Sequence, residues 1–395
     1  TWTDILFLGA QNTLQPGVNT VAVQGFNSTL SSSDFSLDCE VKTPSPGNPG
    51  NPAGGDPTPG AANTVYAANA PPNIRQVEHI PVQPAEGEEV VVTAKVTDPD
   101  GIGSVTLSYQ LVEPGAYIHK EDAAYENGWV PLAMVDNGTG GDGAAGDSVF
   151  TVTMPAGLQV HRRLIRYRIT VEDDLGNAQQ TPYEDDEAPN FAYFCYNGVP
   201  DWSGSKRPGV FRSANYRADA LESIAVYHLI TRESDVIRCQ WSGPTDGVYR
   251  YLGTWVYDGK VYDHMRYRIR GNASVRQVGK NKWKFNFNRA RPLEARDNYG
   301  RRYDVPWDKI NGLAATNPWW RNDVSTDGTV FGESLGFRLY QLAGGLASNT
   351  QFYHFRVIDK AAEAPSDQYD GDFWGLYIAV EQPDIKFLEA RNMPD

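Results

Sequence analysis

The 395-residue sequence has few cysteines and no long apolar run, and each shortage excludes a class of protein. Its cysteines, Cys39, Cys195 and Cys239, lie far apart and match neither a CxxC motif nor a zinc-site spacing. They exclude a disulfide framework and allow at most one bridge. No apolar run reaches the roughly 18 residues of a transmembrane helix, so no transmembrane segment is predicted. The six histidines have no close pairs, which predicts surface or core positions for them rather than metal ligation.

Positive charge is also scarce overall, but it is concentrated in one region. The formal net charge is −14, which argues against nucleic acid as a partner because nucleic-acid-binding proteins carry a basic surface. Residues 250–302 nevertheless contain fourteen Lys and Arg against four Asp and Glu, a local charge of +10. A basic island in an acidic protein favours a small phosphate-bearing ligand over a charged polymer.

Long helical patterns are few, whereas aromatic residues, glycine and proline are plentiful, so we expect a multidomain, β-rich protein. Residues 1–42 contain alternating segments that we interpret as the C-terminal strands of a truncated β-sandwich. The run from Pro16 to Phe35 is similar to the end of a galactose-binding-like jelly roll, which raises the possibility of sugar binding. Residues 43–72 are a Pro/Gly linker. No signal peptide is visible, and we expect the sequence to be a piece of a longer chain.

Residues 73–198 carry short alternating segments separated by strong turns, such as Asp98-Pro99-Asp100-Gly101. This spacing predicts an immunoglobulin-like or fibronectin-like β-sandwich, and the region resembles bacterial Ig-like modules. Such modules occur in exported proteins, so we expect an extracellular or cell-surface location. One glycine-rich loop holds Asp136, Asp142 and Asp147, which could bind calcium; the alternative is a hairpin whose acids are simply solvated.

Residues 200–395 are predicted to form an α+β region, an antiparallel sheet with one main helix on a face. Residues 265–270 alternate arginine with apolar side chains, and residues 280–287 alternate lysine with aromatic ones. If these two strands pair antiparallel, like charges face each other, which is unfavourable unless an anion lies between them. The clearest helix is residues 329–345, where Phe331, Leu335, Leu339 and Leu342 recur at helical spacing.

Four segments in this region resemble the CotH family of spore-coat, protein-kinase-like proteins. They read RIRGNAS, GKNKWKFNF, GESLGFRLYQLAG and FWGLYIAVEQPDIKFL, in the family's order and spacing, within residues 223–395. The resemblance implies a kinase-like N-lobe that binds ATP and magnesium. It also implies phosphate transfer to a protein substrate, which the sequence does not identify.

The resemblance also implies roles for particular residues. A strand lysine would contact the phosphates and be held by a helix glutamate; the candidates are Lys280, Lys282 and Lys284, with Glu333 as partner. Glu333 is equally explained as an acid favoured by the helix dipole. Further phosphate contacts are expected from the residues Arg268, Arg270 and Ser274. Glu381 resembles the position where such folds join their two lobes and meet an adenine ring.

Two departures from the family limit this interpretation. No GxGxxG loop precedes the strand lysines, and the sequence stops before the second lobe that carries the catalytic and metal-binding aspartates. We therefore expect no catalytic residue in this chain and no activity from it alone. The competing hypothesis is a non-catalytic surface or matrix protein, in which β-sandwich modules adhere to glycans or proteins and the kinase-like lobe is a scaffold.

Overall fold

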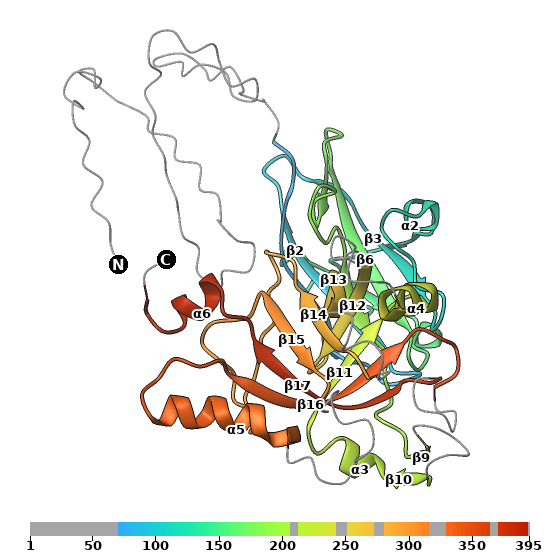
Figure 1. The fold of residues 1–395 in the computed structure, drawn as a ribbon. Helices are drawn as coiled ribbons and strands as arrows, with labels where there is room; N and C mark the ends of the chain where they lie inside the picture. Colours follow the sequence, from blue (N-terminus) through green and yellow to red (C-terminus); the bar gives the residue numbers. More distant parts are fainter. Residues whose placement is uncertain are drawn as a thin grey trace, which may run out of the picture. The chain divides into compact units, whose positions relative to one another are not determined.

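The computed structural model describes residues 70–205, 212–241, 251–271, 280–315, 329–363 and 370–393. Internal contacts divide the chain into two compact units, Thr1–Val65 and Tyr66–Asp395, and every described residue lies in the second. The expected jelly-roll remnant therefore lies outside the described residues, as does most of the linker. The predicted β-rich character is confirmed: the described chain folds into several sheets with few helices (Figure 1). None of the helices in the described ranges is long and apolar enough to cross a membrane.

The first part of the described chain consists of two antiparallel sheets on a shared core. One sheet has the order β1-β2-β5 and the other β4-β3-β6-β7, with β8 also paired to β6. Their bounds are β1 Asn73–Ile80, β2 Val90–Thr97, β3 Ile102–Val112, β4 Val130–Ala133, β5 Val149–Met154, β6 Leu164–Asp173, β7 Ala178–Thr181 and β8 Phe191–Phe194. A short helix, α2 (Ala123–Asn127), precedes β4, and a 3-10 turn (Ala156–Leu158) follows β5.

Strand β2 illustrates why these residues form a sandwich. Val90, Val92, Ala94 and Val96 are buried and alternate with more exposed side chains, as expected for a strand with one core-facing side. They pack with Leu107 and other residues of the second sheet in one hydrophobic cluster. The predicted turn at Asp98 ends the strand: the Asp98 side chain accepts a hydrogen bond from the backbone N–H of Asp100 at 2.7 Å.

The second part is a closed barrel of seven strands, in the order β11-β12-β13-β14-β15-β17-β16. Its strands are β11 Ala225–Ile230, β12 Tyr251–Tyr257, β13 Lys260–Arg270, β14 Lys282–Asn286, β15 Lys309–Leu313, β16 Thr350–Ile358 and β17 Phe373–Glu381. The other elements are the hairpin β9 (Trp202–Gly204) and β10 (Ala214–Tyr216), and the helices α3 (Ala218–Leu221), α4 (Glu233–Trp241), α5 (Thr329–Leu342) and α6 (Ile385–Glu389). Large aromatic side chains, among them Trp255, Trp283 and Trp374, fill the interior.

Barrel closure departs from the expected sheet. The sequence predicts an antiparallel sheet, but β11 pairs parallel with β16, and β12 joins β11 to β13. These pairings close the sheet on itself. The segment β13-β14-β15, then α5, then β16 and β17 still follows the predicted order of strands, one helix and two more strands.

The predicted helix is confirmed as α5, which packs on the outer surface of the barrel (Figure 1). Phe337 contacts a cluster formed by Leu313, Ile378 and Val380, and the Ser334 hydroxyl lies 2.6 Å from that of Thr350. The four residues that marked the helix in the sequence do not form its buried side. Phe331, Leu335, Leu339 and Leu342 are each more than half exposed.

Two buried ion-pair clusters join the sandwich to the barrel. In the first, Arg166 of β6 donates to Asp263 of β13 from Nε at 2.7 Å and from Nη2 at 3.1 Å. In the second, Arg162 donates to both carboxylate oxygens of Asp372, at 2.8 and 2.6 Å. All four side chains are at least nine-tenths buried. The sandwich and the barrel therefore contact each other directly, through specific buried ion pairs.

Candidate functional site

The cationic strands form the outer surface of the barrel along β13 and β14. Their antiparallel register places Arg268 opposite Lys284 and Arg270 opposite Lys282, as the sequence predicts. The intervening side chains point into the aromatic core, among them Tyr267, Ile269, Trp283 and Phe285. Within the described chain none of these four cations forms an ion pair with a carboxylate. Like charges thus face each other across two strands, and no described carboxylate forms an ion pair with any of the four.

Lys284 has the most confined position in this group. Its Nζ donates to the Gln382 side-chain oxygen at 3.1 Å, and Asn311 of β15 donates to the same oxygen at 3.1 Å. Burial lowers the pKa of Lys284, and the nearby charges of Arg268 and Lys309 lower it further. Lys309 itself is paired with Asp384 at 3.0 Å. The residues directly after β17 therefore border the cationic surface, and the local field there is positive.

Lys280 does not join the other lysines. It precedes β14, and its Nζ donates to the backbone carbonyl of Leu376 at 2.6 Å while lying 4.7 Å from the centre of the Tyr377 ring. Burial lowers its pKa to about 8. It lines a cavity of about 750 Å³ between β16–β17 and the β9–β10 hairpin, together with His354 and Phe373. Phe373 stacks on Trp202 with ring centres 4.3 Å apart.

The two glutamates predicted for the nucleotide site have different environments. Glu333 lies on α5 and is exposed, and it forms no ion pair among the described residues. Glu381, the last residue of β17, is buried; its carboxylate pairs with Arg391 at 2.8 Å and accepts the backbone N–H of Asn349 at 2.9 Å. Its carboxylate thus holds the chain around α6 in place. Ser274 lies outside the described residues, in the connection between β13 and β14.

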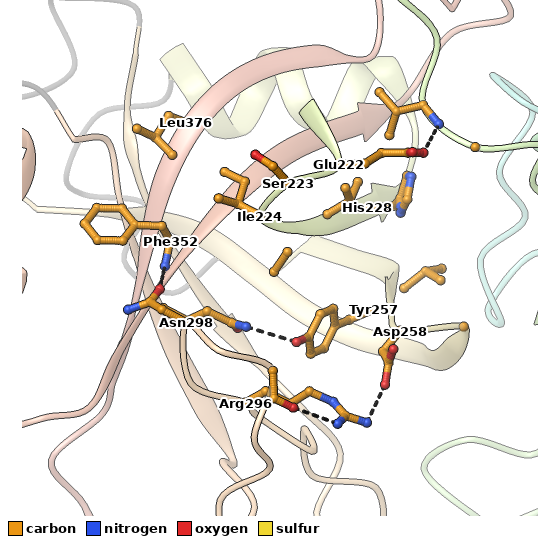
Figure 2. Close-up of a pocket in the computed structure, with 18 of the residues that line it drawn as sticks. Glu222, Ser223, Ile224, His228, Tyr257, Asp258, Arg296, Asn298, Phe352 and Leu376 are labelled. Carbon is orange, nitrogen blue, oxygen red and sulfur yellow. Dashed lines mark hydrogen bonds and ion pairs between the residues drawn. The ribbon is translucent and has the colours of Figure 1, made fainter. Parts of the chain in front are cut away.

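A second cavity, of about 1200 Å³, is lined by residues of β11, β12 and the segment between β14 and β15, among them His228, Tyr257 and Asn298 (Figure 2). Its charged groups are already paired: Arg296 with Asp258 at 2.5 Å, and Glu222 with the backbone N–H of Val199 at 2.8 Å. Asn298 accepts the backbone N–H of Phe352 at 2.8 Å. A cavity whose charged groups are already paired is suited to a largely uncharged ligand rather than to a phosphate.

Two buried histidines were not singled out by the sequence. His228 lines the 1200 Å³ cavity, and burial holds its pKa well below the ordinary value. His354 lines the smaller cavity; its pKa is lowered to about 3, first by burial and then by Arg356, and neither ring nitrogen has a hydrogen-bond partner. Each is an isolated histidine within a strand, β11 or β16, so no sequence signal marked it.

The three candidate metal ligands do come together. Asp136, Asp142 and Asp147 each place one carboxylate oxygen within 4.8 Å of the others, in the loop between β4 and β5. No other group of three such ligands occurs in the part of the chain that the structure describes. The described barrel therefore contains no comparable cluster of carboxylates for magnesium.

Comparisons with known proteins give no family for the chain. No protein-family model matches it, and a search of curated proteins finds no match.

Proposed function

We propose that the barrel region is a CotH-like kinase lobe in which the outer surface of β13 and β14 binds the phosphates of ATP. The whole protein would then transfer phosphate from ATP to another protein, outside the cytoplasm, with the preceding sandwich as an immunoglobulin-like module beside it. The observation that carries the proposal is the pairing of Arg268 with Lys284 and of Arg270 with Lys282, with no ion pair to a carboxylate among the described residues.

An anion between these strands would relieve a real electrostatic cost. Two unit charges about 5 Å apart repel by roughly 1 kcal/mol at the dielectric constant of water, and by more where solvent is partly excluded. Lys284 is half-buried, and the positive charges around it lower its pKa. Phosphate oxygens accept charge-assisted hydrogen bonds from guanidinium and ammonium groups, so a nucleotide's phosphates fit both the charge and the donors of this surface.

The order of elements supports the same proposal. A helix that follows three antiparallel strands and packs outside the sheet, ahead of two further strands, is what the family resemblance implies. Gln382, directly after β17, contacts Lys284, so the backbone that would meet an adenine ring borders the cationic surface. Lys284 is accordingly the preferred phosphate ligand among the three lysines. Lys280 has a separate environment, and Glu333 has no lysine partner among the described residues.

Magnesium is a weaker part of the proposal. Phosphoryl transfer needs a cation to neutralise the phosphates, and kinases hold it with an aspartate and an asparagine. The described barrel offers no group of three carboxylates. We therefore assign to these residues only the binding and orientation of the nucleotide, which is positioning work.

Binding of a fluorescent ATP analogue tests this function. We expect saturable binding to the chain, weakened on the order of ten- to a hundred-fold when both Lys282 and Lys284 are replaced by alanine, because charge-assisted bonds are lost. The matched control replaces Lys95, a partly exposed lysine of β2 in the sandwich. Equal affinity of the double variant and the control variant would reject the assignment. Transfer of labelled phosphate from ATP to a protein by the whole protein, with magnesium present, tests the reaction itself.

A second candidate is a non-catalytic adhesion or scaffold protein, and one observation favours it. The outer side of α5 exposes a continuous set of apolar side chains that includes Leu335, Leu339, Tyr340 and Leu342. Exposed apolar groups of this kind mark contact surfaces. Under this alternative, ATP does not bind, and substitution of the lysines changes nothing.

A further inference from the structure

The loop between β4 and β5 holds a cluster of acids that the proposed kinase function does not use. Asp136, Asp142 and Asp147 belong to residues 136–148, and their nearest oxygens lie within 4.8 Å of one another. The ends of the loop are fixed by reciprocal backbone hydrogen bonds between Val135 and Thr151, at 2.8 and 2.9 Å. The three acids are therefore held close together by the fold, although like charges repel.

Backbone N–H groups orient each of these carboxylates. Asp136 accepts two such hydrogen bonds, one on each oxygen, and Asp142 and Asp147 accept one each. The donors are the N–H groups of Gly146 (2.6 Å) and Ser148 (3.0 Å) for Asp136, Gly138 (2.6 Å) for Asp142, and Val149 (2.9 Å) for Asp147. Each carboxylate keeps free lone pairs. The loop is consequently preorganised, with one oxygen of each acid within 4.8 Å of the others.

Asp142 supplies the observation that points to a ligand. Its side chain is only 8% exposed, and its Oδ1 atom is buried without any hydrogen-bond partner. A buried carboxylate oxygen without a partner is costly unless a cation or a water satisfies it. None of the three acids forms an ion pair with a lysine or arginine in the described chain. No lysine or arginine in the described part of the chain therefore supplies the missing positive charge.

We propose that this loop binds one calcium ion through Asp136, Asp142 and Asp147. Calcium takes six to eight oxygen ligands in flexible geometry, and carboxylates, backbone carbonyls and water provide them. Glycines at positive φ, at 138, 140, 141 and 146, give the short loop the tight turns that such a site requires. Magnesium demands a near-ideal octahedron, and softer metals prefer nitrogen or sulfur, neither of which this cluster offers.

Equilibrium dialysis of the full chain against radioactive calcium, after removal of metals by a chelator, tests the proposal. We expect one site per chain with a dissociation constant of about 10⁻⁵ to 10⁻³ M, the range of sensor and extracellular calcium sites. Asp147→Asn should weaken binding at least ten-fold. Asp147 is exposed, and an asparagine oxygen can still accept the Val149 N–H, so this variant will fold. Asp142→Asn should do the same.

The matched control is Asp185→Asn, which makes the same charge change at an exposed position between β7 and β8. It should bind calcium like the parent. Saturating calcium should also raise the melting temperature of the parent by a few degrees through mass action, and that of Asp147→Asn by less. No binding up to about 10 mM calcium, unchanged binding by Asp147→Asn, or equal affinity for magnesium would each overturn the proposal. None of these results depends on whether the barrel binds a nucleotide.

Discussion

Replacing Asp263 by asparagine should destabilise the protein strongly, because this side chain is the centre of the polar contact between sandwich and barrel. Its carboxylate accepts hydrogen bonds from Arg166, Asn190 and the hydroxyl of Thr254, and all four groups are buried. Burial alone would raise the pKa of Asp263, but the charge of Arg166 and the hydrogen bonds hold that pKa far below its ordinary value.

The size of the effect follows from what the substitution leaves behind. Asparagine removes the negative charge and leaves the fully buried guanidinium of Arg166 without a counter-ion. Breaking a buried ion pair by removing one partner destabilises by about 3–5 kcal/mol. Arg166 keeps hydrogen bonds to the Ile118 carbonyl and to Gln110, and lies 5.2 Å from the Tyr117 ring centre, so we expect the lower half of that range.

Urea-induced unfolding, followed by tryptophan fluorescence, measures this loss. The double variant Arg166→Met with Asp263→Asn should be less destabilised than Asp263→Asn alone, because no charge is then stranded. Since the folded-state pKa of Asp263 is depressed, its contribution is complete above the unfolded-state pKa of about 4 and is lost only in more acidic solution. The deficit of the variant should thus be constant between about pH 5 and 8.

Two results would refute this reasoning. One is an Asp263→Asn variant within about 1 kcal/mol of the parent, the range of an exposed salt bridge. The other is a double variant less stable than the single one. The control Asp185→Asn changes the same charge at an exposed site and should alter stability by no more than about 0.5 kcal/mol.

Two further predictions concern pH and glycine. His354 is buried and neutral, and its folded-state pKa is lowered to about 3. Between pH 7 and pH 5 the parent should therefore lose about 2 kcal/mol of unfolding free energy from this group. Unfolding measured at both pH values should show that His354→Leu loses less unfolding free energy by about that amount. Gly336→Ala on α5 should stabilise by about 0.5–1 kcal/mol, because its added Cβ meets open space. Gly253→Ala on β12 should destabilise instead, because its Cβ would lie 2.9 Å from Leu229. Reversed signs in thermal unfolding would contradict the packing of both sites.

The elements with strict alternation could be predicted from the sequence. In β13 and β14 a one-residue slip would place arginine and lysine in the aromatic core, so alternation determines which side chains face outward. Asp258-Gly259 joins β12 to β13, and both residues adopt positive φ, 53° and 74°, a conformation that an Asp-Gly pair favours in a tight hairpin. Both the alternation of the strands and the tight turn depend only on residues that are adjacent in the sequence.

The closure of the barrel could not be predicted in the same way. It depends on β11 pairing parallel with β16, more than a hundred residues later, and no local pattern encodes such a partner. The exposed leucines of α5 show a related limit. Helical periodicity identified the helix, but its contact with the barrel is made through Phe337 rather than through the leucine stripe.

The candidate site shows where alternation stops being informative. Lys280 shares the parity of Lys282 and Lys284, yet it precedes the strand, and its side chain turns to the carbonyl of Leu376. Alternation predicts the direction of a side chain only for residues that are paired within a strand. The buried contact between Arg166 and Asp263 was also invisible, because each residue reads as an ordinary polar position in its own strand.

The central claim is that the paired cations of β13 and β14 hold the phosphates of a nucleotide, and its most direct test is ATP affinity at several salt concentrations. We expect the parent to bind, with affinity falling as salt rises. The double variant Arg268→Gln with Lys284→Gln should bind at least ten-fold more weakly and depend less on salt, whereas Lys95→Gln should match the parent. A parent that does not bind ATP, or a double variant that binds it equally well, would contradict the account.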